Sequence, residues 1–394
     1  MENQSKSLPS SMPEGWKEHE IENNETHEVN FLKPSISSLK IDVALIQELA
    51  HDRELSDQDR RIKEHICKHL EQKGVLPFPW TPQEVNYMNK QPRTKWLDYL
   101  IYRYKFTIFP KEKIVSDFPT YILIEPISSC NLRCVMCFQV DKTFTKKPYM
   151  GLMDIGLFRE CIDQAVDGGT QSITLASRGE PLLHPKLPAM LEYMSGKFLE
   201  VKIVTNATKL TEELSHHILT TGVNLLVFSV DAHTKEVYES IRVRGNFDEV
   251  YGNIKQFHDI REKYYPDSNL NTRVSAVMFR EDQDPEEFVK FWPGIIDEVG
   301  AKQAAFRWNT YTNPLQPDLN TPCWLLWERL YIWWDGTTNP CDADYKSLLT
   351  PGNVRENSIH EIWHGKKLTQ LREAHINSRR NEYEPCDRCG LRFE

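Results

Sequence analysis

Three cysteines stand close together in the segment SSCNLRCVMCFQV, at Cys130, Cys134 and Cys137. A cubane iron–sulfur cluster has four irons, and its full ligation by protein takes four thiolates. Three thiolates can therefore hold three irons and leave the fourth iron open to bind and reduce a small molecule. The competing interpretation is a structural zinc site. Zinc sites usually come as two spaced CxxC-like pairs, however, and this triplet has no nearby fourth ligand of that kind.

Composition restricts the compartment and the partners of this 394-residue chain. We expect a cytoplasmic protein without a membrane span, because no apolar run approaches the roughly 20 residues that a span needs. The start of the chain lacks the apolar core of a secretory signal, and residues 1–38 contain few apolar positions, which predicts a disordered tail. In the cytosol the nine cysteines stay reduced and available to metal. The net charge of −9, without a basic stripe, argues against a nucleic-acid partner.

Between residues 121 and 310 the chain alternates short β-branched apolar runs with amphipathic stretches, which predicts repeated βα units. Near-continuous apolar strands indicate a parallel sheet covered by helices, and right-handed crossovers would curl six such units into an open barrel. Catalytic groups in such barrels gather at the carboxyl ends of the strands, where the cysteine triplet lies. The predicted strands are 121–126, 171–176, 201–206, 224–231, 272–278 and 302–308.

The region before the barrel, residues 39–120, has helical periodicity at Ile62, Ile66 and Leu70. Ser56 or Asp57 is a plausible cap for this helix, and the prolines of VLPFPWTP end it. Two roles remain open for the region. It is either a helical flank that covers the barrel or a module that docks a substrate or a peptide.

Four motifs follow the first four predicted strands in order: the triplet, SRGEPLLHP, TNAT and FSVDAHTKEVYESIR. Together they resemble the radical S-adenosylmethionine (SAM) superfamily over roughly residues 121–308. The resemblance implies an α/β fold, a partial (β/α)6 barrel, with SAM bound at the open iron of a 4Fe-4S cluster. It also assigns contacts to the adenine, ammonium, ribose and carboxylate of SAM. These contacts are Met136, Gly179, Glu180, Pro181, Asn206, Ser229 and Arg242.

Several positions depart from the superfamily pattern. Met136 stands where an aromatic residue often precedes the third cysteine, and Ala207 and Ala232 replace glycines. Met136 can still offer its backbone to adenine. Arg178 also stands where glycine is usual, which suggests that its side chain contacts the substrate.

The C-terminal region, residues 311–394, begins with a Pro/Asn-rich linker and resembles the SPASM/twitch type of auxiliary cluster domain in its shorter form. A hairpin that turns at Gly336 would bring two of its cysteines together, and a helix from Ser358 would deliver a CxxC pair to the same place. Four thiolates complete the coordination of a second 4Fe-4S cluster. Zinc suits such a set as well, but the upstream triplet favours iron and sulfide. The resemblance assigns as ligands Cys323, Cys341, Cys386 and Cys389.

The two resemblances imply a radical reaction. Reductive cleavage of SAM yields methionine and a 5′-deoxyadenosyl radical, which takes hydrogen from an unactivated C–H bond. The cysteine spacing of the C-terminal region is similar to that of an aminocyclitol dehydrogenase of this superfamily. That similarity implies oxidation of an alcohol carbon in a sugar or aminocyclitol, with the auxiliary cluster as electron acceptor and a flavodoxin- or ferredoxin-type protein as donor. Arg307 and Asn309, after the sixth strand, are candidate substrate contacts.

Three alternatives remain open. A peptide maturase of the same superfamily would use the same clusters, and residues 39–120 would hold a leader peptide. An epimerase would need a spare thiol, which only Cys67 or Cys161 could supply. A scaffold without enzymatic activity would bind zinc and would not cleave SAM.

Overall fold

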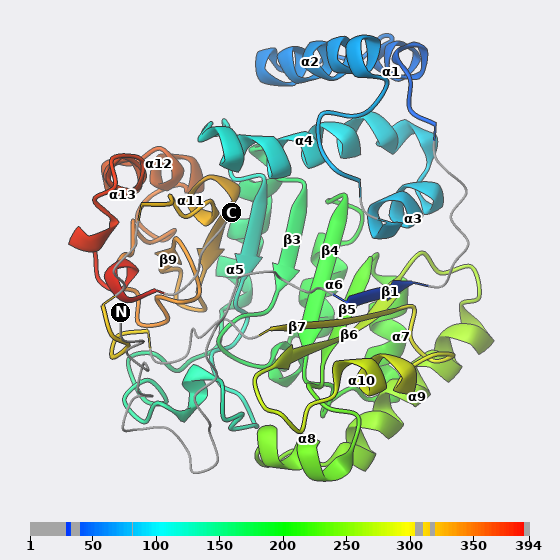
Figure 1. Cartoon of the computed structure of the whole chain (residues 1–394), viewed down its shortest axis with the longest axis vertical. Coiled ribbons are helices and arrows are strands. Elements are labelled where there is room, and N and C mark those ends of the chain that lie inside the picture. Colours follow the sequence, from blue (N-terminus) through cyan, green and yellow to red (C-terminus); the bar gives the residue numbers. More distant parts are fainter. Residues whose placement is uncertain (1–28, 33–39, 81, 304–309, 316–319, 390–394) are drawn as a thin grey trace, which may run out of the picture.

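A computed structural model of the chain describes residues 29–32, 40–80, 82–303, 310–315 and 320–389. Within these residues one nine-stranded sheet runs through the molecule in the order β1-β7-β6-β5-β4-β3-β2-β8-β9 (Figure 1). The strands are β1 (Val29–Leu32), β2 (Tyr121–Ile124), β3 (Ser172–Leu175), β4 (Glu200–Thr205), β5 (Leu225–Ser229), β6 (Asn271–Met278), β7 (Glu298–Gln303), β8 (Arg329–Ile332) and β9 (Thr338–Asn339).

The predicted α/β fold is confirmed. The six strands from β2 to β7 pair in parallel, each with the next along the chain, and form an open partial barrel. The strand β8 joins this sheet in parallel beside β2, so a C-terminal segment extends the barrel wall. The edge strands β1 and β9 pair antiparallel to β7 and β8.

Two expectations about strands are wrong. The sixth parallel strand, β7, is Glu298–Gln303 and begins four residues before the predicted 302–308. Its start is anchored by the carboxylate of Asp297, which accepts a hydrogen bond from the backbone N–H of Thr272 in β6 (2.8 Å). In addition, residues 29–32 form β1, although they were expected to belong to a disordered tail.

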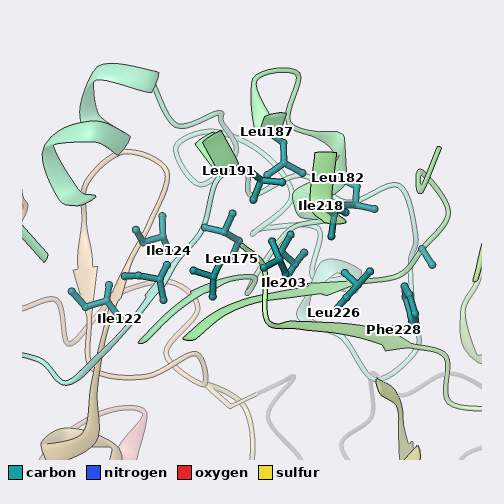
Figure 2. Close-up of a cluster of buried hydrophobic side chains, with 14 of the residues drawn as sticks. Ile122, Ile124, Leu175, Leu182, Leu187, Leu191, Ile203, Ile218, Leu226 and Phe228 are labelled. Carbon is teal, nitrogen blue, oxygen red and sulfur yellow. The ribbon is translucent and has the colours of Figure 1, made fainter. Parts of the chain in front are cut away.

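Helices cover the outer face of the sheet. Apolar side chains that alternate along β2 to β5 form one row, which packs against helices such as α6 and α7 (Figure 2). The helices are α1 (Val43–Ala50), α2 (Asp57–Lys73), α3 (Pro82–Lys90), α4 (Trp96–Glu112), α5 (Ile155–Asp167), α6 (Leu187–Met194), α7 (Glu212–Thr220), α8 (Lys235–Ile241), α9 (Phe247–Tyr264), α10 (Pro285–Phe291), α11 (Leu325–Glu328), α12 (Ile359–Trp363) and α13 (Lys366–Ile376). In the described residues, none of them has both the length and the apolar composition needed to cross a bilayer.

The N-terminal helices α1, α2 and α4 share a small core of their own, and α3 packs with α4 on the barrel at the start of β4 (Figure 1). Ser56 caps α2 by accepting a hydrogen bond from the backbone N–H of Asp59 (3.1 Å), as one of the two predicted caps. Tyr102 of α4 donates a hydrogen bond to the carboxylate of Glu200 (3.0 Å), and Tyr87 of α3 bonds the carbonyl of Leu199. These contacts place the helices against the amino end of the barrel.

The C-terminal segment contains the predicted hairpin and the predicted helix. The strands β8 and β9 form the hairpin, and Gly336 lies in its turn with a φ of +90°, which an L side chain rarely adopts. Ser358 begins α12 with a capping box, in which its side chain and that of Glu361 each bind the other's backbone N–H. The turn at Gly336 and the capping box of α12 therefore fix the path of the backbone between Cys323 and the CxxC pair.

Candidate functional site

The triplet loop leaves β2 at the carboxyl end of the parallel strands, where the sequence placed it. Two backbone hydrogen bonds hold the loop against the last residue of α8 and the segment that follows it. The N–H of Arg133 donates to the carbonyl of Val243 (2.9 Å), and that of Val135 donates to the carbonyl of Ile241 (3.0 Å). Burial raises the pKa of Cys134 to about 11. Thiolate formation here therefore needs a cation or a metal to replace the proton.

The turn of SRGEPLLHP packs directly on the chain that enters the triplet. A Cβ on Gly179 would lie 2.0 Å from the carbonyl oxygen of Ile127, so only glycine fits this approach. The N–H of Glu180 donates to the carbonyl of Ser129 (3.0 Å). The buried amide of Gln139 donates both to the carbonyl of Ser128 (2.7 Å) and across to the turn. The turn thus positions the residues immediately before Cys130.

The carboxylate of Glu180 joins the ends of β3 and β4. It accepts hydrogen bonds from the hydroxyl of Thr205 (2.6 Å) and from the backbone N–H groups of Asn206 (2.7 Å) and Leu182 (3.0 Å). Burial raises the pKa of Glu180 above its usual value. Pro181 is buried beside it and begins a short 3₁₀ helix. Contact of Glu180 with a ligand ammonium stays a prediction, and in this structure its oxygens bind the scaffold.

Asn206, directly after β4, and Arg242, directly after α8, both reach the triplet. The side-chain amide of Asn206 lies 3.7 Å from the Sγ of Cys130, and a guanidinium nitrogen of Arg242 lies 3.8 Å from the Sγ of Cys134. The other terminal nitrogen of Arg242 forms an ion pair with Asp231 (2.6 Å). Both residues of this pair are buried. Sequence reasoning missed Asp231 as a partner, although it stands in the quoted motif after β5.

The remaining predicted ligand contacts have less structural support. Met136 is half-buried in the turn between the second and third cysteines, and Ser229 is the last residue of β5. Arg307 and Asn309 lie outside the described residues. Their assignment to the substrate therefore stays a prediction.

Arg178 does not have the role that its position suggested, because it is a structural connector and is only 3% exposed. Its guanidinium forms two hydrogen bonds with the carboxylate of Glu125, at 2.7 and 2.6 Å. A third hydrogen bond goes to the backbone carbonyl of Tyr345 in the C-terminal segment (2.9 Å). The carbon of the guanidinium also lies 4.1 Å from the centre of the Trp333 ring. Arg178 thus ties the β3 turn to the C-terminal segment and leaves no free fork for a substrate.

The four C-terminal cysteines line one cavity, whose walls are otherwise mostly apolar. The side-chain amide of Asn339 donates to the carbonyl of Cys341 (2.6 Å), and Arg380 donates to the carbonyl of Cys389 (3.0 Å). In the described residues, no three Cys, His, Asp or Glu side chains form a site for a single metal ion. The thiols surround a space, and their chemistry suits a soft metal centre. That these four thiols, of Cys323, Cys341, Cys386 and Cys389, ligate a cluster stays a prediction.

His375 of α13 lines the same cavity and was not singled out in the sequence. Its ring is 1% exposed and its Nδ1 accepts a hydrogen bond from the backbone N–H of Cys323 (3.1 Å). Its Nε2 is buried and has no hydrogen-bond partner in the described part of the chain. A buried orphan of this kind next to four thiols fits a cavity that a metal–sulfur group would fill.

An aromatic stack joins the loop of the triplet to the segment that follows Cys341. Phe138, directly after Cys137, stacks on Tyr345 with ring centres 5.0 Å apart and an angle of 20°. Cys341 packs on the inner face of the sheet against a small cluster that includes Leu123 and Trp333. The stack therefore joins the triplet loop, at the carboxyl ends of the strands, to the C-terminal segment, whereas Cys323 and Cys341 flank β8 and β9 on the side where β8 begins.

The two spare thiols are packed in hydrophobic cores. Cys161 of α5 is 0% exposed and belongs to the main core. Cys67 of α2 is half-buried against the core of the N-terminal helices. Neither position suits a thiol that returns hydrogen to a substrate at the strand ends.

Comparison with known proteins agrees with this arrangement. The sequence profile of the radical SAM superfamily matches residues 124–291, and that of the SPASM iron–sulfur cluster-binding domain matches residues 323–390. The S-adenosyl-L-methionine-dependent 2-deoxy-scyllo-inosamine dehydrogenase of Niallia circulans is 23% identical over 277 residues, which cover 68% of this chain and 92% of that protein.

Other relatives match more locally or in fold alone. The tungsten-containing aldehyde ferredoxin oxidoreductase cofactor-modifying protein of Pyrococcus furiosus is 34% identical over 112 residues, which cover 28% of this chain and only 30% of that protein. The structure of Streptococcus suis SuiB bound to S-adenosylmethionine matches with a TM-score of 0.53 and 16% identity, over 86% of this chain and 87% of that one. That likeness concerns the fold. With the two profiles and the triplet at the strand ends, the chain contains a radical SAM domain, residues 124–291, and a C-terminal SPASM domain, residues 323–390.

Proposed function

We propose that this protein is a radical SAM oxidoreductase that dehydrogenates an alcohol carbon of a sugar or aminocyclitol-like small molecule. The observation that carries the proposal is that the chain holds two separate cysteine sets, the triplet after β2 and the four thiols that line one cavity, in segments joined by the stack of Phe138 on Tyr345. A dehydrogenase needs both a site that starts the radical and a second centre that receives an electron. The similarity to an aminocyclitol dehydrogenase, over 68% of this chain and 92% of that protein, supports this reaction class.

The residues present fit two 4Fe-4S clusters. Cys130, Cys134 and Cys137 would hold the SAM-binding cluster, and the four C-terminal cysteines would hold the auxiliary one. When bound, the first cluster supplies the electron that cleaves SAM to methionine and a 5′-deoxyadenosyl radical. Oxidation of an alcohol carbon would then require the substrate to lose one hydrogen atom to that radical, one proton to a base and one electron to the auxiliary centre.

The chain's own residues would bind and orient the reactants. Gly179 and Glu180 build the turn that faces the triplet, and Arg242 brings a buried positive charge beside Cys134. Along β4 and β6, the inner-face side chains alternate with buried ones and stay half-exposed, among them Lys202 and Ser275. A mixed polar inner wall of this kind suits a small hydroxylated molecule.

The compartment and the donor follow from the same chemistry. We place the protein in the cytoplasm, because thiols that ligate clusters must stay reduced. A flavodoxin- or ferredoxin-type protein would deliver the first electron.

The experiment is isotope transfer with the anaerobically reconstituted protein. A panel of sugars and aminocyclitols deuterated at their alcohol carbons is incubated with SAM, and deuterium is measured in 5′-deoxyadenosine. Transfer from one panel member, with the matching ketone as product, supports the proposal. The variant with Cys130, Cys134 and Cys137 changed to Ala is the control, and its cleavage of SAM would refute the assignment of the triplet.

The second candidate function is peptide maturation. It is favoured by similarity to the subtilosin biosynthesis protein AlbA of Bacillus subtilis, which is 24% identical over 192 residues, 48% of this chain and 39% of that protein. Deuterium that moves only from a labelled peptide would establish this function and refute the dehydrogenation of small molecules.

A further inference from the structure

The ring of His375 is held in one tautomer by the backbone of a cysteine ligand. His375 lies in the last turn of α13, and its Nδ1 accepts the N–H of Cys323 at 3.1 Å. A ring nitrogen that accepts a hydrogen bond carries no proton of its own. The proton of the neutral imidazole is therefore on Nε2, which becomes a hydrogen-bond donor.

This donor has no acceptor in the described part of the chain, although it is buried. Buried N–H groups in native proteins almost always have a partner, because leaving one unpaired costs free energy. The ring lines the cavity of the four cysteines, and the other walls of that cavity include the apolar side chains of Leu325, Leu326 and Leu371. The missing acceptor is therefore something that occupies the cavity.

We propose that His375 donates a hydrogen bond from Nε2 to a sulfur of the auxiliary cluster and thereby raises the reduction potential of that cluster. This inference rests on the proposed function, which places a cluster in the cavity. Hydrogen bonds to cluster sulfurs are one determinant of the potential, because they stabilise the reduced state, whose negative charge is larger. His375 acts through the cluster and is a positioning residue.

The effect suits the electron acceptor of a dehydrogenation. The substrate radical loses one electron, and the auxiliary cluster gains it. A higher reduction potential of the cluster favours this transfer. Arg380 lies along the same cavity, and its positive charge favours the reduced state as well. His375 and Arg380 therefore both favour the reduced state of a cluster in this cavity.

The test uses the full chain with Cys130, Cys134 and Cys137 changed to Ala, so that the auxiliary site holds its only cluster. In this background we compare His375→Leu, His375→Gln and the matched control His360→Leu, which changes an exposed histidine of α12. Glutamine keeps an acceptor for the N–H of Cys323 and a donor for the sulfur. The readouts are iron content and the potential from a redox titration followed by electron paramagnetic resonance.

We expect His375→Leu to shift the one-electron reduction equilibrium about tenfold towards the oxidised cluster, or about 59 mV. His375→Gln should recover most of this shift, and His360→Leu should leave the potential unchanged. A cluster of about four irons whose potential does not change in His375→Leu overturns the role of His375 but leaves the proposed function intact. Zinc in place of iron in the background variant overturns both.

A second measurement covers the case in which His375→Leu loses its cluster. Pulsed hyperfine spectroscopy of the reduced background variant should detect a proton that exchanges in D₂O and a weakly coupled nitrogen in protein labelled with ¹⁵N-histidine. The absence of both signals overturns the hydrogen bond without any change at residue 375.

Discussion

Arg178 offers a sharp test of how the barrel and the C-terminal segment hold together. Its partner Glu125 is 0% exposed, and the two side chains form a bidentate ion pair at 2.7 and 2.6 Å. The change Arg178→Met removes the guanidinium but keeps an unbranched side chain of similar length. It leaves the carboxylate of Glu125 buried without its counterion, and it also removes the hydrogen bond to the carbonyl of Tyr345.

Breaking a buried ion pair at one partner costs about 3–5 kcal/mol, most of it the penalty of the charge left behind. The cation–π contact with Trp333 at 4.1 Å adds about 0.5–2 kcal/mol. Since 1 kcal/mol lowers the Tm of a 150–250-residue domain by about 2–4 °C, the combined loss of about 3.5–7 kcal/mol corresponds to a drop of about 7–28 °C. The assay is thermal unfolding of the reconstituted protein, followed by tryptophan fluorescence because the Trp333 ring faces the lost group.

Two controls separate the ion pair from a general effect of the substitution. Arg159→Met changes an exposed arginine on α5 and should lower the stability by no more than about 0.5 kcal/mol. The double variant Glu125→Gln/Arg178→Met removes the stranded charge, while the amide oxygen can still accept the backbone N–H of residue 178. The double variant should regain at least half of the stability that Arg178→Met loses. A Tm for Arg178→Met within about 2 °C of the parent would refute the reasoning, and so would a double variant no more stable than the single one.

Three further predictions concern the clusters and SAM. Gly179→Ala places a Cβ 2.0 Å from a backbone oxygen, so it should lower the iron content of the triplet site and weaken SAM binding at least tenfold. The control Gly252→Ala, where nothing lies within 4 Å of the new Cβ, should change neither quantity. Equal iron content and equal SAM affinity in the two variants would contradict this prediction. Asp231→Asn removes the ion pair of Arg242 and should weaken SAM binding about tenfold, as measured by calorimetry, while the iron content stays unchanged. An unaltered affinity for SAM would show that this ion pair does not contribute to the SAM site. Cys389→Ser should lower the iron content from about eight to about four per chain while SAM is still cleaved, and full retention of iron would remove this thiol from the auxiliary ligand set.

Local patterns in the sequence determined the elements of this protein. Short, near-continuous β-branched apolar runs predicted the parallel strands, and the position of the triplet after the first of them predicted the end of the barrel at which it lies. The capping chemistry of Ser56 and Ser358 predicted helix starts, and the glycine at position 336 predicted the hairpin. These signals depend on neighbours along the chain, so spacing alone reveals them.

Only the tertiary structure decided which distant groups meet. Arg178 was expected at the substrate, yet its partners are Glu125 and Tyr345, which lie 53 and 167 residues away along the chain. In the same way, the tautomer of His375 depends on an N–H that lies 52 residues before it. No periodicity encodes such contacts, because they arise when separate elements pack and each buried polar group must find a partner.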